Sequence, residues 1–113
     1  MTLNEKIAQI VRNLKHKTAS GEATWDTMID DGFITSRPDS SIVIEKTRRT
    51  RPEGSRKNAP LPPNVFRLIL SDSKGMEVAA LDDSDLPDPT DLIELYEQVA
   101  KSKAEVLADA WLR

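Results

Sequence analysis

The sequence predicts an α+β domain in two layers, in which an antiparallel β-meander of about four strands carries an N-terminal and a C-terminal helix on one face. Apolar residues recur at helical spacing near both ends of the chain, and short β-type runs separated by turn residues fill the middle. The 113 residues match the usual size of one domain, and 38% hydrophobic with 31% charged residues is typical of a folded, soluble protein. We therefore treat residues 1–113 as a single domain.

The first helix is predicted over about residues 3–19. One face of this segment carries an apolar stripe, formed by Leu3, Ile7, Ile10, Val11 and Leu14. Thr2 followed by Glu5 fits a capping box, which satisfies free backbone amides at a helix start. Gly21 is a natural stop, because glycine accepts the left-handed conformation that ends many helices.

Four β-type runs follow, at residues 33–36, 41–47, 65–71 and 76–81. Residues 37–40 and 72–75 separate them in pairs and have the composition of hairpin turns. Phe66, Leu68 and Leu70 alternate with residues that point the other way, so we expect the first set to face the core. Val43 and Ile69, together with Val65, would then lie partly exposed on the opposite face, where a second copy of the chain could cover them.

The last helix opens at Asp88 and Pro89, a capping residue followed by a residue suited to the first helical position. Its apolar face is predicted to run for about 22 residues, through Leu92, Leu95, Tyr96, Val99, Val106, Leu107 and Ala110. Trp111 lies at the edge of that face, and Leu112 points away from it. Trp111 is a candidate interface anchor. The alternative is a terminal turn that folds back onto its own domain.

Between the second and third predicted strands lies a long connection, about residues 48–64, with four prolines. The basic segment, which we define as residues 46–57, overlaps it and has a local net charge of +5. Its six cations are Lys46, Arg48, Arg49, Arg51, Arg56 and Lys57. Long connections in compact domains are usually functional or disordered. If five of these cations met phosphates, the logarithm of the binding constant should fall with the logarithm of the salt concentration at a slope of about −4.5. No aromatic residue stands among the arginines to stack on bases, however.

Residues 72–97 carry nine acidic residues and one lysine. They could therefore bind the basic segment of the same or of another copy.

The segment TASGEATW, residues 18–25, has the threonine–glycine–tryptophan spacing of a group of short, uncharacterised bacterial and phage-associated proteins. In those proteins, as here, a strand ends in a glycine turn, residues 70–75, and a C-terminal helix opens like LIELY, residues 92–96. The resemblance implies an α+β fold and a bacterial or mobile-element origin. No activity is attached to that group, so no functional residue is carried over.

Little in the chain favours catalysis or a cofactor. There is no cysteine, and the single histidine, His16, stands between two lysines that disfavour its protonated form. The aspartates of residues 82–88 resemble a calcium loop superficially, but Pro87 occupies a ligand position and no glycine makes the required turn. They are better explained as charges at a helix start. No apolar run approaches the roughly 20 residues of a membrane span.

We therefore expect a cytoplasmic, non-catalytic interaction module without cofactor or metal, which binds a protein partner or itself, as a homodimer. The expected contact residues are Arg48, Arg49, Arg51, Arg56, Lys57 and Trp111. The alternative is a nucleic-acid-associated protein that binds the phosphate backbone through the same arginines.

Overall fold

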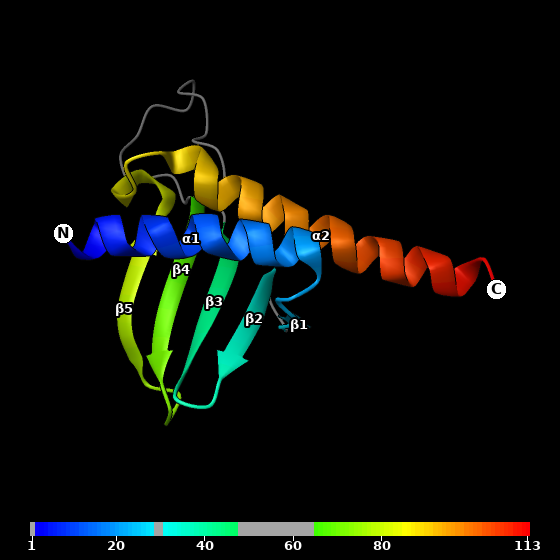
Figure 1. Cartoon of the computed structure of the whole chain (residues 1–113), viewed down its shortest axis with the longest axis horizontal. Helices are drawn as coiled ribbons and strands as arrows, with labels where there is room; N and C mark the ends of the chain where they lie inside the picture. The colour runs from blue at the N-terminus through cyan, green and yellow to red at the C-terminus, as the bar shows by residue number, and fades with distance from the viewer. Residues whose placement is uncertain (1, 29–30, 48–64) are drawn as a thin grey trace, which may run out of the picture.

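The computed structural model describes residues 2–28, 31–47 and 65–113. Two helices, α1 (Leu3–Ser20) and α2 (Pro89–Trp111), lie side by side across one face of an antiparallel sheet (Figure 1). The predicted α+β architecture, with both terminal helices on one face, is confirmed. The sheet has five strands in the described part of the chain rather than about four, because Asp26–Thr27 forms a short edge strand, β1, beside the first predicted strand. Two residues are too few to leave an alternating pattern in a sequence.

α1 begins and ends where its capping residues stand. The Thr2 hydroxyl accepts a hydrogen bond from the Glu5 backbone N–H over 3.2 Å, which is one of the two hydrogen bonds of the predicted capping box. Gly21 adopts the left-handed conformation, with φ of 82°, and its N–H donates to the Thr18 carbonyl. A side chain at Gly21 would be strained in this conformation, and so a glycine ends the helix at Ser20, one residue beyond the predicted boundary.

The sheet follows sequence order, β1-β2-β3-β4-β5, with antiparallel neighbours throughout. Its longer strands are β2 (Gly32–Arg37), β3 (Ser40–Thr47), β4 (Val65–Asp72) and β5 (Glu77–Asp82). Phe33, Ile44 and Leu68 are aligned across β2, β3 and β4, and all three are buried beneath the helices. Phe66 and Leu68 face the core as predicted, whereas Leu70 is half-buried.

An aromatic group joins α2 to the sheet. The Tyr96 ring lies 5.3 Å from the ring of Phe33 and 5.4 Å from that of Phe66, centroid to centroid. Its hydroxyl donates a hydrogen bond to the Asp31 carbonyl over 3.1 Å, so the polar end of this buried side chain has a partner. Burial, with a smaller contribution from the Asp31 charge, raises the pKa of Tyr96 above its ordinary value of 10.0. The core therefore holds a phenol that stays neutral at higher pH than a free tyrosine.

The acidic residues before α2 cap local structure. Asp82 accepts a hydrogen bond from the Ser84 N–H and begins a 3-10 turn, η1 (Asp83–Asp85). Asp88 accepts from the Thr90 N–H over 3.0 Å and begins α2, with Pro89 at its first position. The hydrogen bonds from Thr90 lower the pKa of Asp88 below its ordinary value of 3.8. This confirms the interpretation of these aspartates as charges at a helix start.

Candidate interaction surface

The second half of α2 leaves the domain. Leu92, Leu95, Tyr96 and Val99 are buried, but from Lys101 to Arg113 every residue except Lys103 is exposed. We call residues 101–113 the α2 extension; it projects past the sheet and past the end of α1 (Figure 1). At 1.5 Å per residue, the 23 residues of α2 form a longer rod than the 18 residues of α1. The prediction of one core-facing stripe through Ala110 is therefore wrong beyond Val99, because no core lies beneath the extension.

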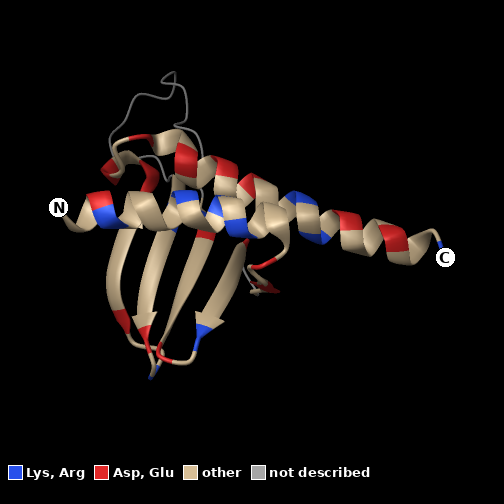
Figure 2. Cartoon of the chain, viewed as in Figure 1, with Lys and Arg blue, Asp and Glu red and all other residues tan. Residues whose placement is uncertain are grey.

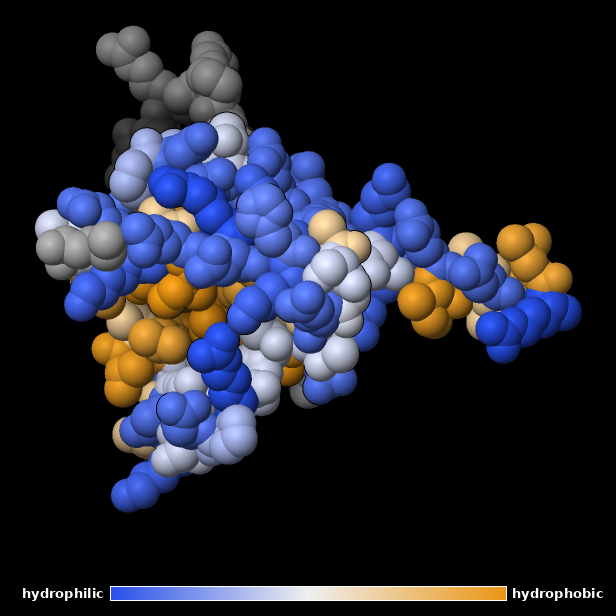
Figure 3. Space-filling view, in the orientation of Figure 1, coloured by the Kyte–Doolittle hydropathy of each residue, from blue (hydrophilic) through white to orange (hydrophobic). Residues whose placement is uncertain are grey.

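Four large apolar side chains stand exposed on the extension: Val106 at 65%, Leu107 at 66%, Trp111 at 88% and Leu112 at 85%. They form separate hydrophobic groups on the projecting end of the molecule in Figure 3. Helical hydrogen bonding continues to the end, where the Leu112 N–H donates to the Ala108 carbonyl. The interpretation in which the terminal turn folds back on its own domain is therefore wrong. Four large apolar side chains exposed within seven residues of one helix are typical of a surface that meets another molecule.

Two small residues belong to the same surface and were not among the sequence-based candidates. Ala100 and Ala104 precede Leu107 and Trp111 at spacings of four, three and four, which places all four on one side of the helix. Ala100 is half-buried and packs against the core, whereas Ala104 is exposed. A heptad pattern over residues 100–111 is the signal in the sequence that could have revealed them.

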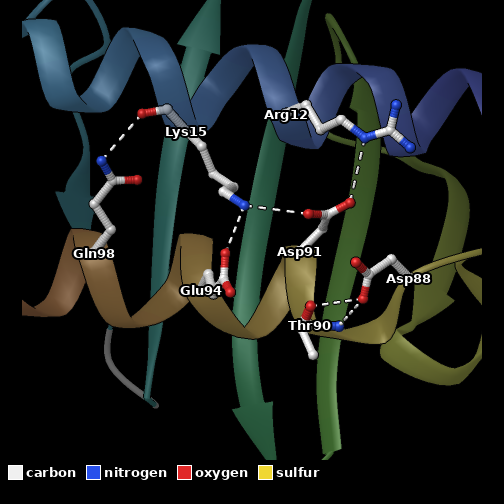
Figure 4. Close-up of polar contacts among 7 residues, drawn as sticks. All are labelled: Arg12, Lys15, Asp88, Thr90, Asp91, Glu94 and Gln98. Carbon is white, nitrogen blue, oxygen red and sulfur yellow. Dashed lines mark hydrogen bonds and ion pairs between the residues drawn. The ribbon is translucent and has the colours of Figure 1, made fainter.

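An ion cluster fixes the position of α2 against α1 (Figure 4). Arg12 Nε lies 3.3 Å from Asp91 Oδ2, and Lys15 Nζ lies 3.2 Å from Asp91 Oδ1 and 2.7 Å from Glu94 Oε2. Gln98 adds a hydrogen bond from its side-chain amide to the Lys15 carbonyl. The hydrogen bond to Glu94 raises the pKa of Lys15 above its ordinary value of 10.5, against the opposing effect of burial. The cluster therefore fixes the direction of the part of α2 that leads into the α2 extension.

The same cluster lines an open depression of about 540 Å³ between the two helices, and His16 stands at its margin. Its charges pair across the helices, because the acidic first turns of α2 lie beside the basic side of α1 (Figure 2). Asp91 and Lys15 are thus already engaged. A substrate or ion would have to displace one of these pairs, and we assign the cluster to holding the helices together.

A second groove, of about 340 Å³, lies beneath α1 and above the β2–β3 hairpin. Its apolar part is formed by Ile10, Leu14, Ile42 and Leu70. Lys17, Glu22 and Arg37 lie at its rim, together with several hydroxyl side chains. The groove has the size of a small-ligand pocket, but its rim charges are of both signs and define no single ligand.

Of the residues expected to make contacts, the structure describes one. Trp111 lies at the end of the α2 extension, while Arg48, Arg49, Arg51, Arg56 and Lys57 lie outside the described residues. The free face of the sheet differs in part from prediction. Val65 and Ile69 are half-buried as expected, but Val43 is 9% exposed and therefore buried, because Ile34 and Ile69 flank it across the neighbouring strands.

Comparison with known proteins adds no relative. No protein-family model, no curated protein and no solved structure matches this chain. Within residues 2–28, 31–47 and 65–113, no helix is both long and apolar enough to cross a membrane. The function is therefore inferred from the surface of the chain itself.

Proposed function

We propose that this protein is a small, non-catalytic interaction module that associates with a second copy of itself through the α2 extension. The observation that carries the proposal is the exposure of Trp111, at 88%, on a helical rod that stands clear of the domain. Tryptophan is among the residues most enriched at the energetic centres of protein interfaces. Leu107 lies one turn away on the same side and enlarges the apolar surface. The paired charges of Arg12, Lys15 and Asp91 support the non-catalytic assignment.

The first test is the absolute mass of the purified protein, measured by light scattering on a sizing column at low and high salt. A dimer that persists at high salt is expected, because the extension contributes apolar contacts that salt does not screen. Trp111→Ala should weaken the dimer by at least about 30-fold, which corresponds to the roughly 2 kcal/mol of an interface hot spot. The substitution should leave the fold intact, since Trp111 is almost fully exposed.

Met76→Ala is the matched control, because Met76 is also an exposed apolar side chain, at 64%, but lies in the β4–β5 hairpin. It should leave the dimer unchanged. A wild-type chain that remains monomeric at every concentration, or a Trp111→Ala variant that dimerises as well as the wild type, would contradict the proposal.

The basic segment favours a second candidate function, association with nucleic acid through the phosphate backbone, on the strength of its local net charge of +5. In the proposed module the same arginines are expected to contact a protein partner. Titration of an unrelated oligonucleotide against salt separates the two functions. Nucleic-acid binding would be supported by a slope of about −4.5 in a plot of the logarithm of the binding constant against the logarithm of the salt concentration. Replacing Arg48, Arg49 and Arg51 together by alanine should then make the slope shallower by about three. Absence of binding at low salt would exclude it.

We place the protein in the cytoplasm, a location supported by a composition without disulfide-forming residues. Fractionation of cells that express a tagged chain tests the assignment. Recovery in the membrane or secreted fraction would contradict it.

A further inference from the structure

One side of α2 carries small and large residues in an order that complements itself. Reading along the helix, Ala100 and Ala104 are followed by Leu107 and Trp111, at the spacing of a coiled-coil seam. This side faces away from α1, because Asp91, Glu94 and Gln98 turn the opposite side of the helix toward Arg12 and Lys15. The seam begins at the core, where Ala100 packs, and continues into the α2 extension.

We propose that two copies of the chain pair their α2 helices antiparallel, about a two-fold axis between Glu105 and Val106. This inference rests on the self-association proposed above and specifies its geometry. Along the side of α2 that carries Ala100, Ala104, Leu107 and Trp111, residues whose numbers sum to 211 then face each other. Trp111 lies over Ala100 of the second copy, and Leu107 lies over Ala104 of the second copy. By symmetry each contact forms twice, so every large side chain meets a small one.

Packing favours this orientation over a parallel one. Large residues set against small ones fill space without strain, whereas voids and overpacking both lower stability. In parallel register, Trp111 would meet Trp111 and Ala104 would meet Ala104, which crowds one end of the seam and leaves the other end empty. Antiparallel pairing also brings each Trp111 onto Ala100 at the edge of the other core, where it covers apolar surface that is only partly buried in one copy.

Charge does not oppose the pairing. Lys101 and Lys103, which flank the seam, would lie against the alanines at 108 and 110 of the second copy. Glu105 and Asp109 lie on the far side of the helix from Leu107 and Trp111 at helical pitch, so the acids of the two copies stay apart. The pairing therefore brings no like charges of residues 100–111 together along the seam.

The interface is small, and its expected affinity is correspondingly modest. Each Trp111 removes roughly 150–250 Å² from water when fully covered. Specific interfaces bury at least about 1,000 Å² of accessible surface in total. The pairing of two α2 helices reaches that size only when Leu107, the alanines and the lysine stems of both copies contribute. We expect a dimer with a dissociation constant in roughly the micromolar range.

Two complementary charge variants test the orientation. Ala104→Glu and Leu107→Lys each place a charge opposite an apolar residue of the second copy, and each variant alone should be monomeric at concentrations where the wild type is dimeric. Mixed in equal amounts they should form a heterodimer, because the introduced carboxylate of one chain then meets the introduced ammonium of the other, and the second contact remains alanine against leucine. Both positions are exposed, so the fold should survive, which circular dichroism of each variant checks.

The outcomes separate this inference from the proposed function. If the wild type dimerises and Trp111→Ala does not, but the mixture stays monomeric, self-association stands and the antiparallel register is wrong, because parallel pairing never brings residues 104 and 107 together. If Ala104→Glu alone dimerises like the wild type, the seam is not the interface. If the wild type is itself monomeric, the proposed function fails first. Mass measurement and capture of an untagged variant by its tagged complement give the readouts.

Discussion

Two carboxylates that bind the same lysine should differ several-fold in their effect on stability. Asp91 and Glu94 both accept a hydrogen bond from Lys15, but the Asp91 side chain is 13% exposed and that of Glu94 is 58% exposed. Asp91 also contacts Arg12 and stands in the first turn of α2, where the helix dipole favours a negative charge. The matched substitutions Asp91→Asn and Glu94→Gln remove each charge and preserve each shape.

We expect Asp91→Asn to lower the free energy of unfolding by about 2 kcal/mol. Hydrogen bonds to charged groups contribute about 1.5–3 kcal/mol, and the low part of that range applies because the Arg12 side chain is 53% exposed and screened by solvent. Glu94→Gln should cost less than about 0.5 kcal/mol, the usual value for an exposed ion pair. For a domain of this size, the first variant should melt roughly 8 °C below the wild type.

Urea unfolding followed by far-ultraviolet circular dichroism measures both differences, provided that the dependence on urea keeps the same slope. Added salt should abolish the small effect of Glu94→Gln and leave most of the effect of Asp91→Asn, because the buried pair is screened less. Equal losses in the two variants, or a loss below about 0.5 kcal/mol for Asp91→Asn, would refute the assignment of Asp91 as the centre of the cluster.

Two further predictions concern α2. Val99→Ala should destabilise the domain by about 2 kcal/mol and Val106→Ala by less than about 0.5 kcal/mol, because Val99 is 1% exposed and Val106 is 65% exposed. Urea unfolding measures both losses. Losses of similar size would show that the α2 extension does not begin after Val99. The pKa of Tyr96 is raised in the folded state, so its contribution to stability is present below about pH 10 and is lost as pH rises through the folded-state pKa. Tyr96→Phe should therefore lose less stability than the wild type between about pH 8 and pH 11. Both proteins should still lose some stability over this range, because the pKa of Lys15 is also raised in the folded state. A decline of equal size in both proteins would show that Tyr96 does not titrate with unfolding.

Element boundaries could be predicted well where a single residue type has a strong local preference. Thr2 and Gly21 bound α1, and Asp88 with Pro89 starts α2, because each acts on backbone groups within one turn of itself. The ends of the hairpins and the alternation of buried and half-buried residues along β4 could also be predicted from the sequence, because turn residues and strand alternation act over a few residues. The short strand β1 was not, because it exists only through its pairing with β2.

The interaction surface was predictable only in part. Trp111 stands out in the sequence as a large apolar residue at the edge of a helical stripe, and its side chain is exposed as an anchor requires. The same stripe predicted the wrong environment for Val106 and Leu107, because helical periodicity reports which residues share a face and says nothing about where the neighbouring elements end. Ala100 and Ala104 could have been found only by testing residues 100–111 for a heptad pattern, since an alanine by itself marks neither a core nor a surface.

Local chemistry is thus enough to set the order, type and ends of the main elements, because capping, turn formation and alternation act over a few residues. Tertiary structure decides which part of each apolar face is buried. α2 is longer than the α1 and sheet surface on which it packs, so identical valines at 99 and 106 lie in opposite environments. Only the folded arrangement creates the α2 extension, because burial depends on the lengths of all three packed elements together and on the ion cluster that aligns them.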